Sequence, residues 1–345
     1  MRNQIKKEFR TIPYFILLVI LAVMIFYVLG KKNHGTINSK ENNDYFPLVL
    51  GTDWFAQAEH GGFYQAVAEG IYEKYGLNVK IKMGGPQVNG IQLLLADEVQ
   101  FYVPASYIMM SAAKQKLPII SVAAIFQKDI QVLLAHPNVG NDTLENMKNK
   151  PIFISAPTAA SIWGFLEGKY GYKESQKKSY SHSLTPFLQD KNSIQEGILT
   201  SEPYLIEKNF GFKPVAILLS DYGFSGYGEL LTTTKKFEEK HPKIVQNFVN
   251  ATLEGWKSYL ENPTLGNELI KNANPEMTDE LLQFAHQKFI NEKIISGGDA
   301  ELYGMGIMTD VRWREFANML IESKAFDKNI DYHSIYTLKY LNNTK

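Results

Sequence analysis

Short apolar runs alternate with longer stretches of helical spacing along this chain from about residue 46 onward. The runs have the length of buried strands, and the stretches place apolar residues three or four positions apart, on one face of a helix. The pattern predicts strands at 47–51, 78–83, 99–103, 117–126, 130–135, 151–155 and 215–219. It predicts helices at 63–71, 88–95, 104–113, 158–170, 203–209, 241–260, 263–272, 278–290 and 309–323, with a further amphipathic segment at 191–199. This alternation favours an α/β protein whose parallel sheets are covered by helices.

The alternation comes in two series. The first ends near residue 135, and a similar series begins with the predicted helix cap at 141–143 and the strand at 151–155. The two series predict two lobes, each a sheet covered by helices, with a cleft between them.

The N-terminus has a different pattern. Basic residues at 2, 6, 7 and 10 precede an uninterrupted apolar run from 14 to 29, which is typical of a secretory signal. The excess of positive charge before the run predicts that the N-terminus stays inside and the rest is exported, which makes the protein periplasmic. Residues 1–30 are therefore a signal peptide or a signal anchor. Because no clear small-residue cleavage site follows, we favour anchoring to the cytoplasmic membrane by residues 13–30. The polar stretch 31–45 predicts a flexible linker.

Composition excludes several classes of function. The 345 residues hold 36 Lys and Arg against 36 Asp and Glu, so we expect no nucleic-acid partner. The lack of Cys rules out disulfides, thiolate metal sites and a Cys nucleophile. The 7 His have no metal-ligand spacing, and no GxSxG, P-loop or dinucleotide motif is present. We therefore expect no catalytic residue, no metal and no cofactor.

The stretch 52–66 is the strongest candidate for a ligand site. It joins a predicted strand to a predicted helix, and ligands of open α/β sheets bind at the carboxyl ends of the strands. Trp54 offers a flat apolar face, although a core role is the usual one for tryptophan. Asp53 and His60 offer hydrogen-bonding groups, with helix capping as the alternative role. Gly61 and Gly62 would let a ligand approach the free backbone N–H groups of the helix.

Several motifs resemble one known family. They are Asp53-Trp54, the run from His60 to Ala66, Gly70, the run from Tyr75 to Val79, Gly84-Gly85-Pro86, Gln127-Lys128-Asp129, and the run from Thr200 to Tyr204. Together they resemble the NMT1/THI5-like solute-binding proteins over roughly residues 47–260. These are receptors of ABC importers for thiamine-pyrimidine precursors, with relatives for nitrate, sulfonates and taurine. The motifs are specific to the family and much less specific to the ligand.

The resemblance implies a periplasmic-binding-protein-like fold of type II. Residues 46–136 with 226–345 would form lobe one, and 137–225 lobe two. Closure of the lobes would capture a small planar nitrogen heterocycle as the small-molecule ligand. The protein would deliver this ligand to an ABC permease in the inner membrane without converting it chemically. One alternative is a pyrimidine-synthase-like enzyme, but the fungal synthases of the family carry a Cys-rich motif that this chain lacks. Another is a nitrate, sulfonate or taurine receptor, which the acidic candidate residues disfavour.

Further candidate residues open predicted helices. Glu202 precedes Pro203 at a helix start, where the helix dipole alone favours an acid. In the resembled family a Glu here often faces the cleft from the second lobe. Tyr204, in the same motif, is a weaker candidate. The remaining candidates follow strands and offer hydroxyls for an anion or a carbonyl, with N-capping as the alternative. They are Ser106, Tyr107, Ser155 and Thr158.

Overall fold

The computed structural model describes residues 45–341. The predicted signal segment 1–30, and the predicted linker except Tyr45, lie outside the described residues. Among the described residues, no helix is both long enough and apolar enough to cross a membrane.

The first sheet has five strands in the order β2-β1-β3-β10-β4. The strands are β1 (Phe46–Gly51), β2 (Leu77–Lys82), β3 (Phe101–Tyr102), β4 (Ile119–Phe126) and β10 (Gly228–Thr234). β1 runs parallel to β2 and β3, whereas β10 runs antiparallel to β3 and β4.

The second sheet has five strands in the order β7-β6-β8-β5-β9. They are β5 (Gln131–Ala135), β6 (Ile152–Ile154), β7 (Lys177–Ser179), β8 (Ile194–Ile198) and β9 (Val215–Leu218). β6 is parallel to β7 and β8, and β5 is antiparallel to β8 and β9. Both sheets are therefore mixed, which corrects the prediction of parallel sheets. The chain passes from the first sheet to the second at β5 and returns to the first at β10. Each of these two strands is antiparallel to its neighbours.

Three strands were missing from the prediction. β7 is a short polar strand, β8 lies inside the segment described only as amphipathic, and β10 carries a polar Thr run. The division into lobes stays a prediction, but one of its boundaries needs moving. β5, which we assigned to lobe one, pairs in the second sheet, so we now place the boundary near residue 129.

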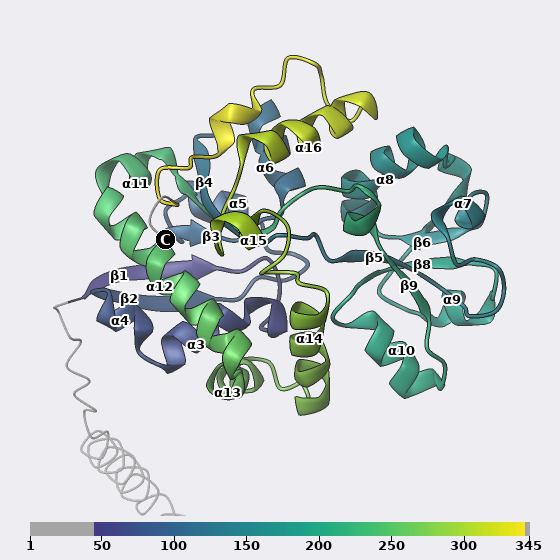
Figure 1. Ribbon diagram of the computed structural model, residues 1–345, viewed down its shortest axis with the longest axis horizontal. Coiled ribbons are helices and arrows are strands. Elements are labelled where there is room, and N and C mark those ends of the chain that lie inside the picture. Colours follow the sequence, from purple (N-terminus) through teal and green to yellow (C-terminus); the bar gives the residue numbers. More distant parts are fainter. Residues whose placement is uncertain (1–44, 342–345) are drawn as a thin grey trace, which may run out of the picture. The chain divides into compact units, whose positions relative to one another are not determined.

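Helices surround both sheets, as Figure 1 shows. Those that follow strands of the first sheet are η1 (Ala58–His60), α3 (Gly61–Ala68), α4 (Ile71–Lys74), α5 (Gly90–Leu95), α6 (Ser106–Lys114), α11 (Lys235–Lys240), α12 (Pro242–Glu261), α13 (Thr264–Ala273), α14 (Asp279–Asn291), α15 (Asp299–Tyr303), α16 (Asp310–Glu322) and η4 (Tyr332–Ile335). Those that follow strands of the second sheet are α7 (Leu144–Met147), α8 (Ala156–Tyr170), η2 (Glu174–Gln176), α9 (Thr185–Gln189), α10 (Glu202–Phe210) and η3 (Leu219–Tyr222).

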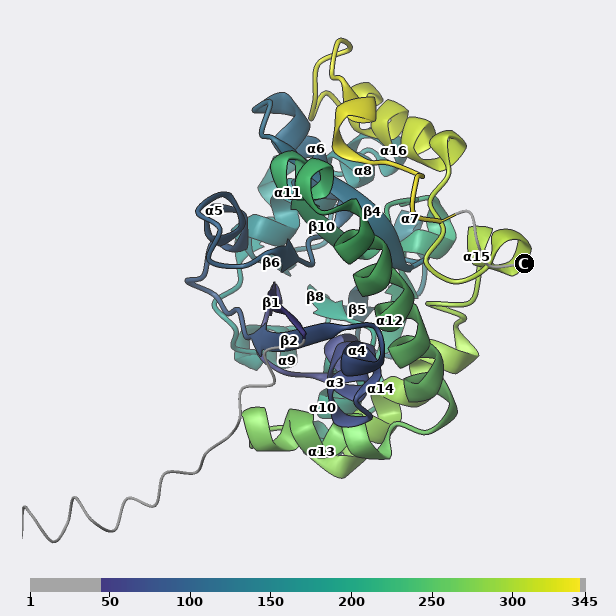
Figure 2. The same cartoon turned by 90° about the vertical axis from the view of Figure 1, so that its left-hand side faces the viewer.

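The long C-terminal helices match the predicted spacing closely. α12, α13, α14 and α16 begin and end within a residue or two of the predicted bounds. Their apolar stripes are buried, and Trp256 on α12 and Trp313 on α16 are completely so. Trp163 on α8 is also buried, so these three tryptophans belong to the core. α3 packs against α12 and α13, and the three lie together in Figure 2.

Candidate ligand-binding site

The loop after β1 presents Asp53 and Trp54 at the carboxyl end of that strand. The Thr52 hydroxyl donates to the carbonyl of Trp54 at 2.7 Å, and the Gly84 N–H donates to the same carbonyl at 3.1 Å. These bonds hold the loop against the segment after β2. Trp54 is half-buried, and its ring centroid lies 6.2 Å from that of His182, a residue from the segment after β7. Trp54 is therefore not a core tryptophan.

Asp53 and His60 form a pair rather than helix caps. His60 Nε2 lies 3.0 Å from Asp53 Oδ1, and neither η1 nor α3 has a side-chain hydrogen bond at its N-cap. His60 is completely buried, whereas the side chain of Asp53 is 45% exposed. The buried imidazole thus orients a carboxylate that remains open to solvent.

Gly61 and Gly62 have a packing role in this structure. A Cβ on Gly61 would lie 2.1 Å from the ring of Tyr259, and a Cβ on Gly62 would lie 2.2 Å from the ring of Trp256. Both contacts are far too short, so a side chain at either position would push α3 away from α12. The missing side chains are explained by helix packing, and they no longer argue by themselves for the approach of a ligand.

Carboxylates from both sheets gather near this loop. We call Asp53, Glu59, Glu196, Glu202 and Glu229 the carboxylate cluster. Glu59, on η1, accepts a hydrogen bond from the Thr200 hydroxyl, which follows β8 in the second sheet. Glu202 Oε2 accepts from the Ile198 N–H at 2.7 Å, and Glu196 Oε2 accepts from the Ser155 N–H at 2.9 Å.

Burial raises the pKa of most of these carboxyl groups. For Glu202, desolvation raises the pKa to about 7, opposed by backbone hydrogen bonds and assisted by the charges of Glu59 and Glu196. Desolvation also raises the pKa of Glu59 and of Glu196. For Glu229 the rise is large, and the further contributions come from Asp53 and Glu59. The mutual influence of these groups indicates that they face a common, poorly hydrated region.

Lys and Arg side chains of residues 45–341 do not pair with this cluster. Within residues 45–341, no Lys or Arg forms an ion pair with any member of the carboxylate cluster, and the one ion-pair contact is that of Asp53 with His60. Such a region suits a partner that carries N–H donors or positive charge and repels an anion.

The other predicted residues differ in where they lie. Ser155 caps α8 by accepting from the Thr158 N–H, and through Glu196 both adjoin the carboxylate cluster. Ser106 is buried and exchanges hydrogen bonds with the backbone of Tyr227. Tyr107 packs against Phe326, and Tyr204 packs against Phe284. The contacts of Ser106, Tyr107 and Tyr204 within the described range are thus structural, and none of them reaches the carboxylate cluster.

Five residues of this region were not predicted from the sequence, namely Tyr102, Tyr180, His182, Glu196 and Glu229. Tyr102, at the end of β3, has a pKa raised by burial and by the charges of Asp53 and Glu229. Burial raises the pKa of Tyr180, and the charges of Glu202 and Glu196 raise it further. His182 opposes the rise in the pKa of Glu196. Glu229 was missed because β10 was not predicted as a strand. A recognisable signal was available for Tyr102, which lies one residue before the end of the predicted strand 99–103.

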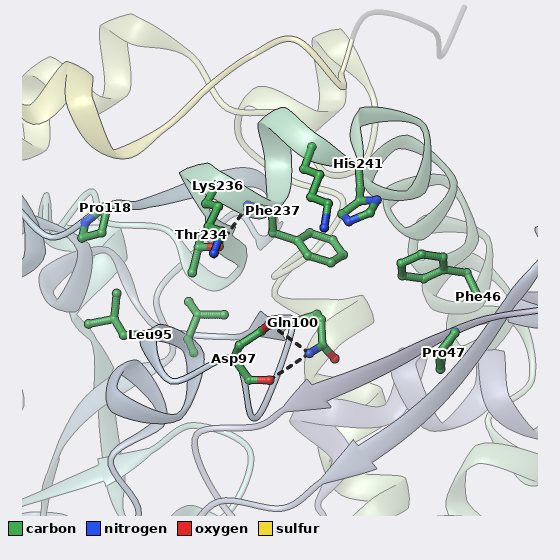
Figure 3. A pocket seen from close by; sticks show the side chains of 12 residues that line it. Phe46, Pro47, Leu95, Asp97, Gln100, Pro118, Thr234, Lys236, Phe237 and His241 are labelled. Carbon is green, nitrogen blue, oxygen red and sulfur yellow. Dashed lines mark hydrogen bonds between the residues drawn. The ribbon is translucent and has the colours of Figure 1, made fainter.

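Two cavities lie at different distances from the carboxylate cluster. One of about 390 Å³, shown in Figure 3, is lined by Phe46, Pro47, Phe237 and their neighbours. At about 3.3 Å per residue along β1, Pro47 is roughly 20 Å from Asp53, so this cavity is not part of the site. The other, of about 370 Å³, is lined by residues 86–91 with Tyr102 and Ile108. It adjoins the carboxylate cluster through Tyr102.

Comparison with solved structures defines the class of protein. The aliphatic sulphonate binding protein SsuA from Escherichia coli matches with a TM-score of 0.63 at 11% identity, over 87% of this chain and 94% of that one. The two mixed sheets therefore form a type II periplasmic-binding-protein fold. The NMT1/THI5-like family model matches residues 57–265, and the chain belongs to that family.

Two curated relatives are similar over most of their length. The formylaminopyrimidine-binding protein of Halalkalibacterium halodurans is 22% identical over 306 residues, which is 83% of this chain and 89% of that protein. The riboflavin-binding protein RibY of Chloroflexus aurantiacus is 19% identical over 304 residues, 85% of this chain and 86% of that protein.

Proposed function

We propose that this protein is the solute-binding component of an ABC importer and captures a small planar heterocycle rich in N–H donors. The observation that carries the proposal is the combination of a half-buried Trp54 with a carboxylate cluster drawn from both sheets and lacking a Lys or Arg partner within residues 45–341. An aromatic face with acceptors at its edge matches a planar ring with amino groups.

In this proposal Trp54 stacks on the ring, and Asp53 and Glu202 accept its N–H groups from opposite sides. Asp53 Oδ1 is engaged by His60, so Oδ2 is the oxygen that faces the ligand. Because Asp53 follows a strand of the first sheet and Glu202 a strand of the second, the ligand binds the closed arrangement more tightly than an open one. The ligands named for the two curated relatives, a formylaminopyrimidine and riboflavin, are both nitrogen heterocycles and support this class.

The two alternatives have weaker support. A nitrate, sulfonate or taurine receptor needs several cationic or N–H donors, and the cluster offers acceptors instead. A pyrimidine-synthase-like enzyme would have to work without the Cys-rich motif of the fungal synthases, since the chain contains no Cys. Binding without chemical conversion is therefore the function we favour.

We place the folded part outside the cytoplasmic membrane, beside an ABC permease. The basic and apolar N-terminal pattern supports export, with residues 13–30 as the anchor. A C-terminal fusion to a reporter that works only in the cytoplasm should be inactive. An active reporter would refute export.

A thermal-shift screen of the purified protein in EDTA tests the ligand class. Aminopyrimidines, other nucleobase-like compounds and flavins form one arm, and nitrate, taurine and alkanesulfonates form the other. We expect the unfolding temperature to rise with a member of the first arm, and mass spectrometry to recover that compound unchanged. A rise confined to the second arm would overturn the heterocycle proposal, and a converted product would favour the enzyme.

A further inference from the structure

Glu229, on β10, is a buried member of the carboxylate cluster to which the heterocycle proposal assigns no contact with the ligand. The residue is 9% exposed, and its Oε2 is buried with no hydrogen-bond partner among residues 45–341. The charged groups that influence it are Asp53 and Glu59, both acidic. A buried carboxylate without a donor or a cation is strongly unfavourable when ionised. Its neighbourhood therefore favours a positive partner, and no Lys or Arg among residues 45–341 pairs with it.

Two other potential metal ligands lie beside Glu229. Asp53, His60 and Glu229 each offer one ligand atom, and these atoms all lie within 4.8 Å of one another. The imidazole of His60 is completely buried, and its Nε2, 3.0 Å from Asp53 Oδ1, is the nitrogen that faces the group. The buried Oε2 of Glu229, which has no hydrogen-bond partner among residues 45–341, is thus an unpartnered polar atom beside a buried imidazole, beyond the mere presence of acidic residues.

We propose that Asp53, His60 and Glu229 bind a divalent first-row transition-metal ion such as Zn²⁺, Mn²⁺ or Co²⁺. An imidazole with two carboxylates is a ligand set for these ions, whereas Mg²⁺ and Ca²⁺ prefer oxygen ligands alone. In tetrahedral geometry, metal–ligand bonds of about 2.0–2.2 Å place two ligands of one ion ~3.4 Å apart. Ligand atoms that lie up to 4.8 Å apart must therefore approach one another by up to ~1.4 Å when the ion binds.

The site would be open on one side. Asp53 has a 45% exposed side chain, while His60 and Glu229 form the buried floor. Three protein ligands leave a coordination position free, as in metal sites that bind a further molecule. The inference goes beyond the proposed function, because a metal ion would bind here whether or not the transported solute is a heterocycle.

No metal was predicted from the sequence because its histidines have no metal-ligand spacing. His60 is the one histidine of the group, and Glu229 reaches it from a distant strand. Such a set has no local motif. In addition, Glu229 has a φ of +45°, a left-handed conformation that is rare for a Glu within a strand.

Calorimetric titration of the purified, EDTA-treated and dialysed full-length protein with ZnCl₂ and CoCl₂ tests the proposal. We expect one ion per chain, with Mg²⁺ and Ca²⁺ at least tenfold weaker. Glu229→Gln keeps the shape but removes a ligand charge, and should weaken Zn²⁺ binding at least tenfold. Asp53→Asn, at an exposed side chain, should do the same without disturbing the core, and serves if Glu229→Gln fails to fold.

The matched control is Asp129→Asn, since Asp129 is another buried carboxyl group and belongs to neither proposed site. It should bind Zn²⁺ as the unaltered protein does. Wild-type protein that binds no Zn²⁺ or Co²⁺ at micromolar concentration would overturn the proposal, as would unchanged affinity in both Glu229→Gln and Asp53→Asn. The ligand screen in EDTA has an independent outcome, so the failure of one proposal leaves the other standing.

Discussion

At the scale of single residues, Trp54 distinguishes a binding role from a packing role. Base–aromatic stacking in nucleic-acid sites is worth about 1–3 kcal/mol by alanine substitution, the nearest measured analogue. Trp54→Ala should therefore weaken binding of the identified heterocycle roughly tenfold to a hundredfold, as measured by calorimetric titration.

Trp313→Ala is the control for this prediction. Trp313 is completely buried and stacks on Tyr336 with 5.3 Å between the ring centroids. Its loss should lower the melting temperature while the folded fraction keeps its affinity. Equal affinities in Trp54→Ala and the unaltered protein would show that the binding site lies elsewhere.

Protonation of Glu202 makes the stability of the folded protein depend on pH. Desolvation raises its pKa from 4.5 to about 7 in the folded protein, and the neighbouring Glu59 and Glu196 act in the same direction. Because the folded state holds this proton more tightly than the unfolded chain, the contribution to stability is fully present below pH 4.5. It is lost as the pH rises through about 7.

The unfolding free energy, measured by urea titration, should therefore fall between pH 4.5 and 7 through Glu202. Glu59, Glu196 and Glu229 contribute with the same sign, since burial raises the pKa of each. Glu202→Gln removes one titrating group and should make the fall shallower. Identical pH slopes in the variant and the unaltered protein would contradict the buried position of Glu202.

At the scale of elements, the contact between α3 and α12 depends on Gly61. Its φ of −55° is helical, so Ala would suit the backbone and, on propensity alone, would stabilise the helix by about 1 kcal/mol. The 2.1 Å approach of its Cβ to Tyr259 reverses that expectation. Gly61→Ala should lower the unfolding free energy by roughly 1–3 kcal/mol, the range for overpacked cores, in urea denaturation.

Gly168, on α8, is the matched control. A Cβ there would meet Ser323 at 3.6 Å, an ordinary van der Waals distance. Gly168→Ala should therefore be neutral or stabilise by up to about 1 kcal/mol. If Gly61→Ala likewise left the unfolding free energy unchanged or raised it, the inference that α3 packs closely on α12 at Gly61 would be wrong.

At the scale of the whole folded unit, Arg312 joins the two chain segments that connect the sheets. Its guanidinium donates to the carbonyl of Gln127, which follows β4, and to those of Ser225 at 2.8 Å and Gly226 at 3.1 Å, which precede β10. A second link lies between the same segments, where Lys128 Nζ is 2.7 Å from Asp221 Oδ1. The two segments that connect the sheets are thus held together by the forked guanidinium of Arg312 and by this ion pair.

Arg312→Lys keeps the charge but loses the fork. It should lower the unfolding free energy by about 1–3 kcal/mol and speed amide hydrogen exchange around residues 127–130 and 222–227. Arg314→Lys is the control, since its side chain is 52% exposed and its Asp310 partner is 3.9 Å away. Unchanged exchange in Arg312→Lys would mean that other contacts hold the connection.

The local parts of this structure were predictable from the sequence. The crossover from β1 into α3, and helices such as α12 and α16, follow from apolar residues at strand or helix spacing, a pattern that is complete within a few turns of chain. Family membership was likewise predictable, because the matched region contains short motifs such as the run from His60 to Ala66. The candidate residues Asp53 and His60 also lie together, since they are close neighbours along the chain.

Tertiary structure decided what depends on distant partners. The strand direction of β5 and β10 follows from how the chain crosses between sheets, and no local pattern records it. The packing role of Gly61 depends on Tyr259, and the burial of Glu229 depends on the strands and loops around it. The carboxylate cluster arises for the same reason. Each carboxylate is an ordinary polar residue in sequence, and its unpaired charge becomes visible only when both sheets bring such groups to one poorly hydrated region.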